Sequence, residues 1–416
     1  MRIFKFGGAS VKDAESINNV KTVLETTGIE NLVVVVSAMG KTTNALEKVV
    51  SNYLDKSPEL QASLAFVADY HYQILKELFP EKSHPVYGEI HALFEELKSF
   101  FELNKSTSHA YVYDQVVCFG ELISTKIISH FLNKNNIRNN WLDSRECIKT
   151  DNNYRDAGVE WEQTQTQIKE KVNTKTLTVT QGFLGSNENN FTTTLGREGS
   201  DYTAAIFAYC LGAESVTIWK DVPGVLNADP REFQNTVLLE QISYREAIEM
   251  AFYGASVIHP KTLQPLQRKE IPLFVKSFLN PTQPGTSVAK GQDLVPAVSC
   301  YIVKKEQVLI SLSSLDFSFM VEDNIGEVFK LLHAYKMKVN KIQNSAISFT
   351  VVVDNKYNKL EELLIQLRSK FKVRYNENVT LYTIRHFKEK EVEKLENGFE
   401  VLLKQQSRDT MQLVVK

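Results

Sequence analysis

The stretch from Thr194 to Arg231 constrains the fold most, because it places a polar glycine loop, an apolar helix and a strand in direct succession. The loop from Gly196 to Asp201 permits close backbone approach through its glycines, and its Ser and Asp side chains can cap a helix. The apolar spacing of Tyr202 to Leu211 predicts a buried helix that Gly212 would terminate, and Ser215 to Trp219 predicts a buried strand. In an α/β fold, ligands bind at such loops, beyond the carboxyl ends of parallel strands.

Two further strand–loop–helix units near the N-terminus support a parallel α/β sheet. Asn31 to Ser37 is a continuous β-branched run of the kind buried on both faces of such a sheet. Arg2 to Phe6 predicts a strand that ends in a glycine pair, Gly7 and Gly8, before a helix. This arrangement offers backbone N–H groups to a phosphate, and Lys5 would add a charge. A plain tight turn is the alternative, and neither the Rossmann fingerprint nor the P-loop motif occurs.

Size, charge and cysteine usage exclude several classes of protein. A chain of 416 residues predicts two or three domains, and its net charge of -2 gives no general attraction to nucleic acid or membrane. The cysteines form no CxxC pair or Cys/His cluster, so we expect reduced, buried thiols rather than zinc ligands or disulfides. No signal peptide or membrane-spanning run is visible, so a cytoplasmic location is the default expectation.

The middle of the chain is expected to complete the catalytic domain. Residues 46–103 predict a helical subdomain, rich in Leu, Phe, Lys and Glu. Glu121 is expected at the first turn of a following helix, Leu122 to Leu132, where the helix dipole favours a carboxylate. Leu273 to Ser277 is interpreted as the last strand of the sheet, because a Pro/Gly loop of the kind that closes a domain follows it.

The C-terminal third has a different, smaller pattern. From Val308 to Tyr375 the expected order is strand, helix, strand, strand, helix, strand, which is the split βαβ, ferredoxin-like plan. A strand from Thr380, a helix from Glu389 to Leu403 and a strand from Met411 follow, too few for a complete second copy. We therefore expect a catalytic domain at 1–298, a ferredoxin-like domain at 299–378 and a partial second unit at 379–416.

Six motifs in this order resemble those of the aspartate kinases, of the amino acid kinase superfamily, over essentially the full chain. They are KFGGASV (Lys5 to Val11), FGE (Phe119 to Glu121), GREGSD (Gly196 to Asp201), WKDVPG (Trp219 to Gly224), DPR (Asp229 to Arg231) and GASVIHP (Gly254 to Pro260). The resemblance implies an open, mostly parallel, eight-stranded type of sheet with helices on both faces, and a C-terminal regulatory region of ACT type. It implies transfer of the γ-phosphoryl group of ATP to the side-chain carboxylate of L-aspartate, the first step towards lysine, threonine and methionine.

The resemblance also implies a role for individual residues on the acid-substrate side. Arg197 would hold a substrate carboxylate as a bidentate fork, which suits guanidinium geometry. Glu121 would accept the aspartate ammonium, with Thr43 and Ser37 at the same end of the site. Asp201 would orient Lys5 or a metal-bound water. The alternative for the loop is a simple ion pair between Arg197 and Asp201.

On the nucleotide side, the resemblance implies that Mg²⁺ is carried mainly by ATP phosphate oxygens rather than by protein ligands. Lys5 would neutralise the phosphoryl group in flight. The ATP-binding residues implied in this way are Lys5, Gly7, Gly8, Ser10, Lys220, Asp221, Asp229, Arg231 and Ser256. The alternatives are a turn cap for Asp221 and an ordinary turn former for Asp229.

The chain departs from the family in the catalytic domain, at Ser256, Glu198 and Ala9, and in the regulatory region. Many members have a lysine where this chain has Ser256, and we expect Lys220, in preference to Lys41 or Lys261, to supply the missing charge. Glu198 stands where glycine is frequent and is expected to face solvent or pair with a cation.

A further departure lies in the regulatory region. Asn340 and Ala346 stand where lysine-inhibited members have acidic residues, so lysine inhibition is not expected. A homodimer through the ACT-like region is expected, because such a sheet usually needs a partner. Two other functions stay open: another superfamily member, such as an acetylglutamate kinase, and a non-catalytic amino-acid sensor.

Overall fold

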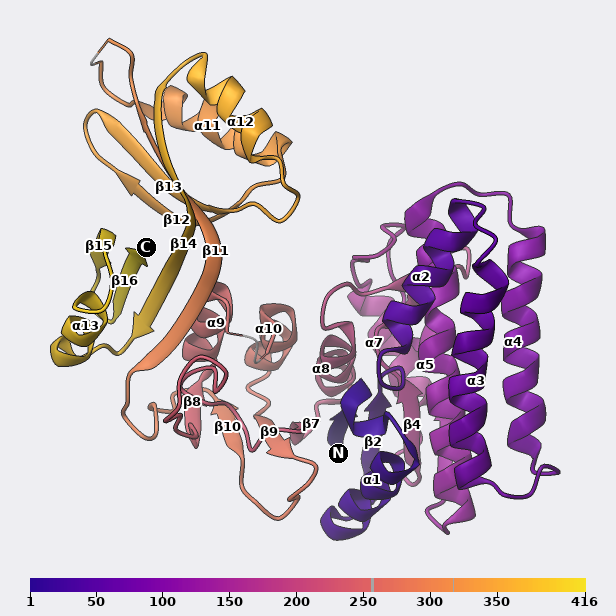
Figure 1. Ribbon diagram of the computed structural model, residues 1–416. Coiled ribbons are helices and arrows are strands. Elements are labelled where there is room, and N and C mark those ends of the chain that lie inside the picture. Colours follow the sequence, from indigo (N-terminus) through magenta and orange to yellow (C-terminus); the bar gives the residue numbers. More distant parts are fainter. Residues whose placement is uncertain (256–257, 317) are drawn as a thin grey trace. The chain divides into compact units, whose positions relative to one another are not determined.

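The computed structural model describes residues 1–255, 258–316 and 318–416, and the chain divides into two compact units (Figure 1). The first unit comprises Met1–Val225, Leu238–Ile248 and Ser256–Pro296. The second comprises Leu226–Val237, Glu249–Ala255 and Ala297–Lys416. None of the helices in the described parts of the chain combines the length and apolarity that a membrane span requires.

The first unit is built on an eight-stranded sheet in the order β3-β4-β2-β1-β7-β9-β10-β8. Neighbouring strands run parallel except for the antiparallel pair β9 and β10. The strands are β1 (Arg2–Phe6), β2 (Leu32–Val36), β3 (Asn139–Leu142), β4 (Leu177–Gln181), β7 (Ser215–Lys220), β8 (Gln241–Ser243), β9 (Leu273–Ser277) and β10 (Thr286–Ala289). The predicted α/β class with a mostly parallel sheet is confirmed. The expectation that Leu273–Ser277 ends the sheet is wrong, since the chain returns after the Pro/Gly loop as β10.

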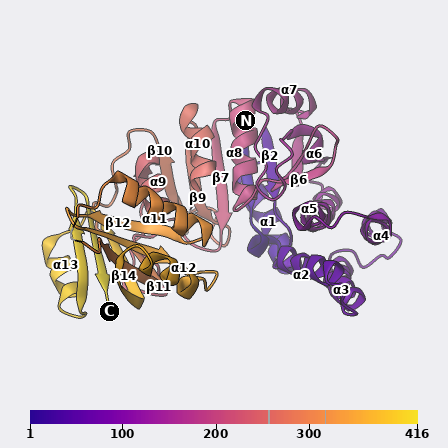
Figure 2. The same cartoon turned by 90° about the horizontal axis from the view of Figure 1, so that it is seen from above.

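Helices cover both faces of this sheet (Figure 2). On one face, α8 (Gly199–Leu211) packs on β1, β2 and β7, with α7 (Trp161–Lys171) and α10 (Pro260–Arg268) beside it. The other face packs into one apolar cluster with α1 (Ala14–Thr27) and the four helices α2 (Thr42–Leu54), α3 (Leu60–Leu78), α4 (Pro85–Leu103) and α5 (His109–Lys134). Because side chains alternate along a strand, Phe4 and Phe6 enter this cluster, whereas Lys5 of the same strand points to the opposite face.

Helix α5 starts earlier than predicted from the sequence, which changes the position of Glu121 in it. The sequence predicted a helix that starts at Leu122, but α5 begins at His109 and Glu121 lies in its interior. Gly120, which precedes Glu121, is closely packed, because a Cβ there would lie 3.0 Å from the Cβ of Ala38 and 3.3 Å from Cγ2 of Thr42. The missing side chain therefore brings α5 against the loop after β2 and the start of α2.

The second unit contains a six-stranded antiparallel sheet in the order β12-β13-β11-β14-β16-β15. Its elements are β11 (Cys300–Ser313), α11 (Glu322–Ala334), β12 (Lys338–Asn344), β13 (Ser348–Asp354), α12 (Leu360–Arg368), β14 (Lys372–Arg385), α13 (Glu389–Glu396), β15 (Val401–Gln406) and β16 (Thr410–Val415). The order from β11 to β14 confirms the predicted split βαβ plan.

Two boundaries in this unit differ from the sequence prediction. The strands predicted near Val373 and from Thr380 are one continuous strand, β14, which pairs with the long β11. The helix predicted to reach Leu403 ends at Glu396, and Leu403 lies in β15. Leu403 packs against the buried cluster that contains Leu381 and Val414, so tertiary packing decides the strand.

Candidate active site

A cavity of about 580 Å³ lies in the first unit, where β1, β2, β4 and β7 end. This is the edge at which parallel α/β sheets bind ligands. The residues predicted from the sequence that line it are Lys5, Gly8, Ser37, Thr43, Glu121, Arg197, Asp201 and Lys220. The remaining lining residues are Ala38, Gly40, Tyr113, Arg155, Phe183, Gly196, Glu198, Gly199 and Ser200. The structure therefore brings together side chains from distant parts of the chain.

A buried ion pair joins β1 to the first turn of α8. Nζ of Lys5 lies 2.7 Å from Oδ1 of Asp201, and both side chains are at most one-tenth exposed. Burial alone would raise the pKa of Asp201, but Lys5 and Lys220 together hold that pKa below its ordinary value. Asp201 is therefore ionised and orients Lys5, and the alternative of an Arg197–Asp201 pair is not what the loop adopts.

The glycine turn after β1 packs backbone against backbone. The amide of Gly40 donates to the carbonyl of Gly8 at 3.0 Å. A Cβ on Gly8 would lie 2.7 Å from the oxygen of Gly40 and 2.8 Å from that of Ala38, so only glycine fits. The hydroxyl of Ser10 is directed to the carbonyl of Trp219, at 3.4 Å, and Ser10 is buried away from the cavity lining.

Gly7 lies directly over the side chain of Lys5. A Cβ at Gly7 would stand 3.3 Å from Nζ of Lys5, although Gly7 is not among the residues that line the cavity. The glycine pair therefore has two separate functions in the turn. Gly7 leaves space above the ammonium group, and Gly8 allows the turn to approach the loop after β2.

Only one of the two carboxylate oxygens of the buried Glu121 accepts a hydrogen bond from a described residue. Its Oε1 accepts a hydrogen bond of 3.3 Å from the backbone N–H of Ala38, while Oε2 has no hydrogen-bond partner among the described residues. Burial raises the pKa of Glu121 to about 8, against the opposing effects of the Ala38 amide and the Lys5 ammonium. A buried acid with an unused oxygen in a cavity is suited to an ammonium ligand, which would supply the missing donors.

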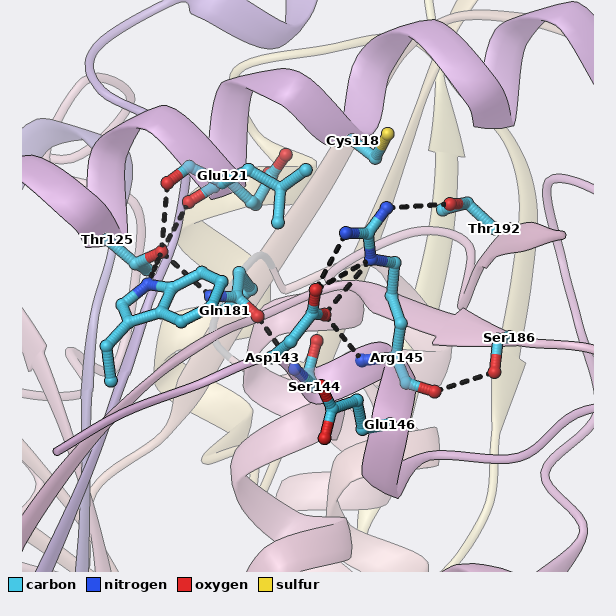
Figure 3. Close-up of polar contacts among 12 residues, drawn as sticks. Cys118, Glu121, Thr125, Asp143, Ser144, Arg145, Glu146, Gln181, Ser186 and Thr192 are labelled. Atoms are coloured by element: carbon cyan, nitrogen blue, oxygen red, sulfur yellow. Dashed lines mark hydrogen bonds and ion pairs between the residues drawn. The ribbon is translucent and has the colours of Figure 1, made fainter. Parts of the chain in front are cut away.

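A hydrogen-bond network fixes the helix turn behind Glu121 (Figure 3). The hydroxyl of Thr125 donates to the carbonyl of Glu121 at 2.9 Å and accepts from Nε2 of Gln181 at 2.9 Å. Oε1 of Gln181 in turn accepts from the backbone of Ser144 at 2.7 Å. The network joins α5 to β4 and to the short helix α6 (Ser144–Cys147), so the position of Glu121 does not depend on its own single hydrogen bond.

The GREGSD loop adopts left-handed backbone at two positions. Gly196 has φ +80°, and Glu198, the N-cap of α8, has φ +54°. Arg197 is exposed at the cavity. The expectation for Glu198 is wrong, because it lines the cavity and its Oε2 is buried without a hydrogen bond from any described residue. The left-handed conformation turns this side chain inward.

The predicted nucleotide-binding residues are only partly brought to the cavity. Lys220, at the end of β7, lines it. Asp221 is exposed and is not part of the lining. Asp229 and Arg231 belong to the second unit and pair with each other, with Nη2 of Arg231 2.6 Å from Oδ2 of Asp229. Ser256 lies outside the described residues, so the nucleotide roles of these residues stay predictions.

Three side chains of the cavity were missed by the sequence reasoning: Tyr113, Arg155 and Phe183. Tyr113 precedes Glu121 by two helical turns, so the correct helix start would have placed both on one face. Phe183 lies in the loop after β4 and belongs to none of the six motifs. Arg155 lies in a loop with no recognisable pattern.

Comparisons with known proteins agree with this geometry. The model of the amino acid kinase family matches residues 1–277. The lysine-sensitive aspartokinase 3 of Escherichia coli is 32% identical over 357 residues, which cover 85% of this chain and 78% of that protein. The chloroplastic aspartokinase 1 of Arabidopsis thaliana is 31% identical, over 85% of this chain and 63% of the relative.

Solved structures extend the similarity to the whole chain. Aspartokinase III of E. coli in complex with lysine and aspartate has a TM-score of 0.84 and 29% identity. The same enzyme with aspartate and ADP has a TM-score of 0.83 and 28% identity. Each comparison covers 100% of this chain and 96% of the other. The chain therefore belongs to the amino acid kinase family, and its relatives across both units are aspartokinases.

Proposed function

We propose that this protein is an aspartate kinase, which transfers the γ-phosphoryl group of ATP to the side-chain carboxylate of L-aspartate. The observation that carries the proposal is the half-satisfied Glu121 in the same cavity as Lys5 and Arg197. A site with one unused acid and several cations suits an amino dicarboxylate, which carries one ammonium and two carboxylates. The E. coli structure that contains aspartate and ADP supports the same pairing of substrates.

The residues of the cavity can promote this reaction by positioning and charge neutralisation alone. An oxygen of the substrate carboxylate attacks the γ-phosphorus, the bond to the β,γ-bridging oxygen breaks, and ADP leaves with that electron pair. Lys5, held by Asp201, neutralises charge on the transferred group. Arg197 binds a substrate carboxylate, and Glu121 binds the ammonium with Ser37 and Thr43 at the same end.

The nucleotide half of the site is proposed to centre on Lys220. Lys220 supplies the charge that Ser256 lacks, since it lines the cavity and acts on Asp201. Of the two alternative cations, Lys261 forms an ion pair with Asp156, and Lys41 is not among the residues that line the cavity. Asp221, Asp229 and Arg231 remain proposed contacts of ATP, as do the glycine turn and Ser10.

Magnesium fits this site as an ion bound mainly to ATP. Asp201, next to the proposed position of the transferred phosphoryl group, is engaged with Lys5. No group of three or more Asp, Glu, His or Cys side chains within the described residues forms a metal site. Mg²⁺ often keeps few protein ligands and binds substrate phosphates, where it neutralises their charge.

A hydroxamate assay tests the proposed function. ATP-dependent acyl hydroxamate formation would be measured with aspartate, glutamate and acetylglutamate in parallel, with Lys5→Met as the inactive control. We expect product with aspartate and little with the others. Product with acetylglutamate alone would favour the other superfamily activity, and no product with any acid would favour the amino-acid sensor.

The second unit is proposed to mediate dimerisation and regulation, with domain limits at 1–298, 299–378 and 379–416. Lysine is not proposed as its effector. Oδ1 of Asn340 accepts from Nζ of Lys304 at 2.7 Å, and its Nδ2 donates to Gln307 at 2.6 Å. The amide is therefore already engaged, and it cannot offer the charge that a carboxylate offers to a ligand ammonium.

A further inference from the structure

The six-stranded sheet of the second unit has a polar region on the face that its helices α11 and α12 do not cover. Ile310 and Leu312 of β11 pack into one apolar cluster with these two helices. Because side chains alternate along a strand, Ser311 and Ser313 point to the opposite face. Over these residues β11 pairs with β13 and β14 without a register shift, so the same alternation applies to all three strands.

Two rows of polar side chains cross the three strands on this uncovered face. The rows are Lys372–Ser313–Ser348 and Arg374–Ser311–Thr350. A cavity of about 190 Å³ lies among them, and its described lining residues are Ser311, Leu312, Ser313, Ser348, Lys372 and Arg374. Strands that are separated along the chain thus contribute hydrogen-bond donors to one small cavity.

The two basic side chains of this cavity have no partner of opposite charge. Within the described residues neither Lys372 nor Arg374 forms a hydrogen bond or an ion pair, and both are exposed. None of the described lining residues is an acid. The next acid after β11, Asp316, accepts hydrogen bonds from the backbone and the hydroxyl of Ser318, at 3.1 and 2.6 Å. The local charge is therefore positive, although the whole chain has a net charge of -2.

The hydroxyl groups of the two rows add neutral donors to the basic side chains. Oγ of Ser311 and Oγ1 of Thr350 are 3.0 Å apart, so one hydroxyl donates to the other and the second keeps its own proton available. Among the described residues, Oγ of Ser313 has no hydrogen-bond partner. Ammonium, guanidinium and hydroxyl groups are the side-chain donors with which proteins bind phosphate oxygens.

The size of the cavity and the residue types around it limit the ligand. Ordinary small-molecule pockets measure roughly 300–1,000 Å³, so about 190 Å³ accommodates a single anionic group. A phosphate monoester carries about 1.5 to 2 negative charges and three acceptor oxygens, which match two basic groups and several hydroxyls better than a carboxylate does. The lining offers no acid to the ammonium of an amino acid. The two rows contain no aromatic side chain on which the bases of a single-stranded nucleic acid could stack.

We propose that this cavity binds a phosphate group, either as the free ion or as the monoester of a small molecule. The guanidinium of Arg374 and the ammonium of Lys372 bind the phosphate oxygens, and the hydroxyls of Ser311, Ser313 and Ser348 complete the contacts. The cavity belongs to the second unit and the candidate active site to the first, so this inference does not depend on the proposed function.

Residue-resolved acetylation of the full chain tests the proposed site. Lysines would be acetylated with limiting reagent, in phosphate or in sodium chloride of equal ionic strength, and the modification of each lysine would be quantified by mass spectrometry. Phosphate should protect Lys372, because a bound amine is a poorer nucleophile. Lys330, an exposed lysine of α11 that does not line the cavity, should react equally in both salts.

A substitution of the arginine separates specific binding from general screening. Loss of hydrogen bonds to a charged group should raise the phosphate concentration for half-protection of Lys372 about tenfold to a hundredfold in Arg374→Gln. Arg408→Gln is the matched control, because Arg408 is an exposed arginine in the turn between β15 and β16 and does not line the cavity. Neither substitution should change the melting temperature.

Further ligands identify the source of the phosphate group and the results that would refute the site. Stronger protection by glycerol 3-phosphate supports a monoester, and stronger protection by inorganic phosphate supports the free ion. The proposal is wrong if neither protects Lys372, if acetate protects it equally, or if Arg374→Gln leaves the half-protection concentration unchanged. Protection by a single-stranded oligonucleotide alone would make this face a nucleic-acid surface and would also overturn the proposal.

Discussion

The raised pKa of Glu121 predicts that aspartate binding depends strongly on pH. Burial raises this pKa to about 8 in the protein without ligand, but only the ionised carboxylate can pair with an ammonium. The ionised fraction is then about 1% at pH 6, about 10% at pH 7 and about half at pH 8. The apparent affinity for aspartate should therefore increase about fiftyfold from pH 6 to pH 8.

Calorimetric titration with aspartate in the presence of ADP measures both parts of this prediction. The dissociation constant should fall with pH up to about 8 and then level off. At pH 7, binding should release about 0.9 proton, which appears as a dependence of the heat on the ionisation enthalpy of the buffer. Glu121→Gln is the matched variant, because it keeps the shape and cannot titrate. At pH 8 it should bind aspartate about tenfold to a hundredfold more weakly, and its affinity should be nearly constant with pH.

Stability gives a second readout of the same carboxyl group. The unfolded chain releases this proton near the ordinary pKa of 4.5, and the folded protein releases it near 8. Between these values the folded state holds more protons, so its stability must fall as pH rises. Glu121→Gln should therefore be more stable than the wild type at pH 8 and similar at pH 4. A wild-type affinity for aspartate that is constant between pH 6 and 8, or a variant that keeps the wild-type pH dependence, would refute this reasoning.

Three further predictions test other parts of the structure. Lys220→Ala should raise the KM for ATP with little effect on that for aspartate, and an unchanged ATP constant would remove Lys220 from the nucleotide site. Gly8→Ala should lower the free energy of unfolding by about 1–3 kcal/mol in a denaturant titration, because its Cβ would meet two backbone oxygens at 2.7 and 2.8 Å; Gly88→Ala, with no atom within 4 Å of the new Cβ, is the neutral control. Titration of activity with lysine, threonine and methionine should show no potent inhibition by lysine, and strong inhibition would contradict the role given to Asn340.

The sequence predicted the strand–loop–helix units well because their signals are local. The β-branched run at β2, the glycines after β1 and the apolar spacing of α8 each specify an element without help from the rest of the chain. The convergence of Lys5, Arg197 and Glu121 at one cavity followed from family motifs, since no local rule places them together. That part of the site could be expected, although its geometry could not.

The wrong element boundaries lie where contacts distant in the sequence decide the structure. The helix predicted to start at Leu122 begins at His109, and Gly120 lies inside it, where Ala38 and Thr42 pack closely. Leu403 continued a helical pattern, yet it lies in a strand that pairs with β16 and packs against the buried cluster of Leu381 and Val414. Arg155 had no signal at all, because its conformation depends on Asp114, which is far away in the sequence.

Helix α5 shows how the same residue type can serve structure at one turn and ligand binding at another. Asp114 and Glu121 are both buried acids, and burial raises the pKa of Asp114 to about 6 and that of Glu121 to about 8. Asp114 accepts three hydrogen bonds from Arg155 and Thr194, and so anchors the loop of Arg155 and the strand end that precedes the GREGSD loop. Glu121 accepts only one hydrogen bond from another described residue, the backbone N–H of Ala38, although it is buried almost as deeply as Asp114. Because an unsatisfied buried carboxyl group destabilises the free protein, its retention at this turn is best explained by the ammonium that satisfies it on binding.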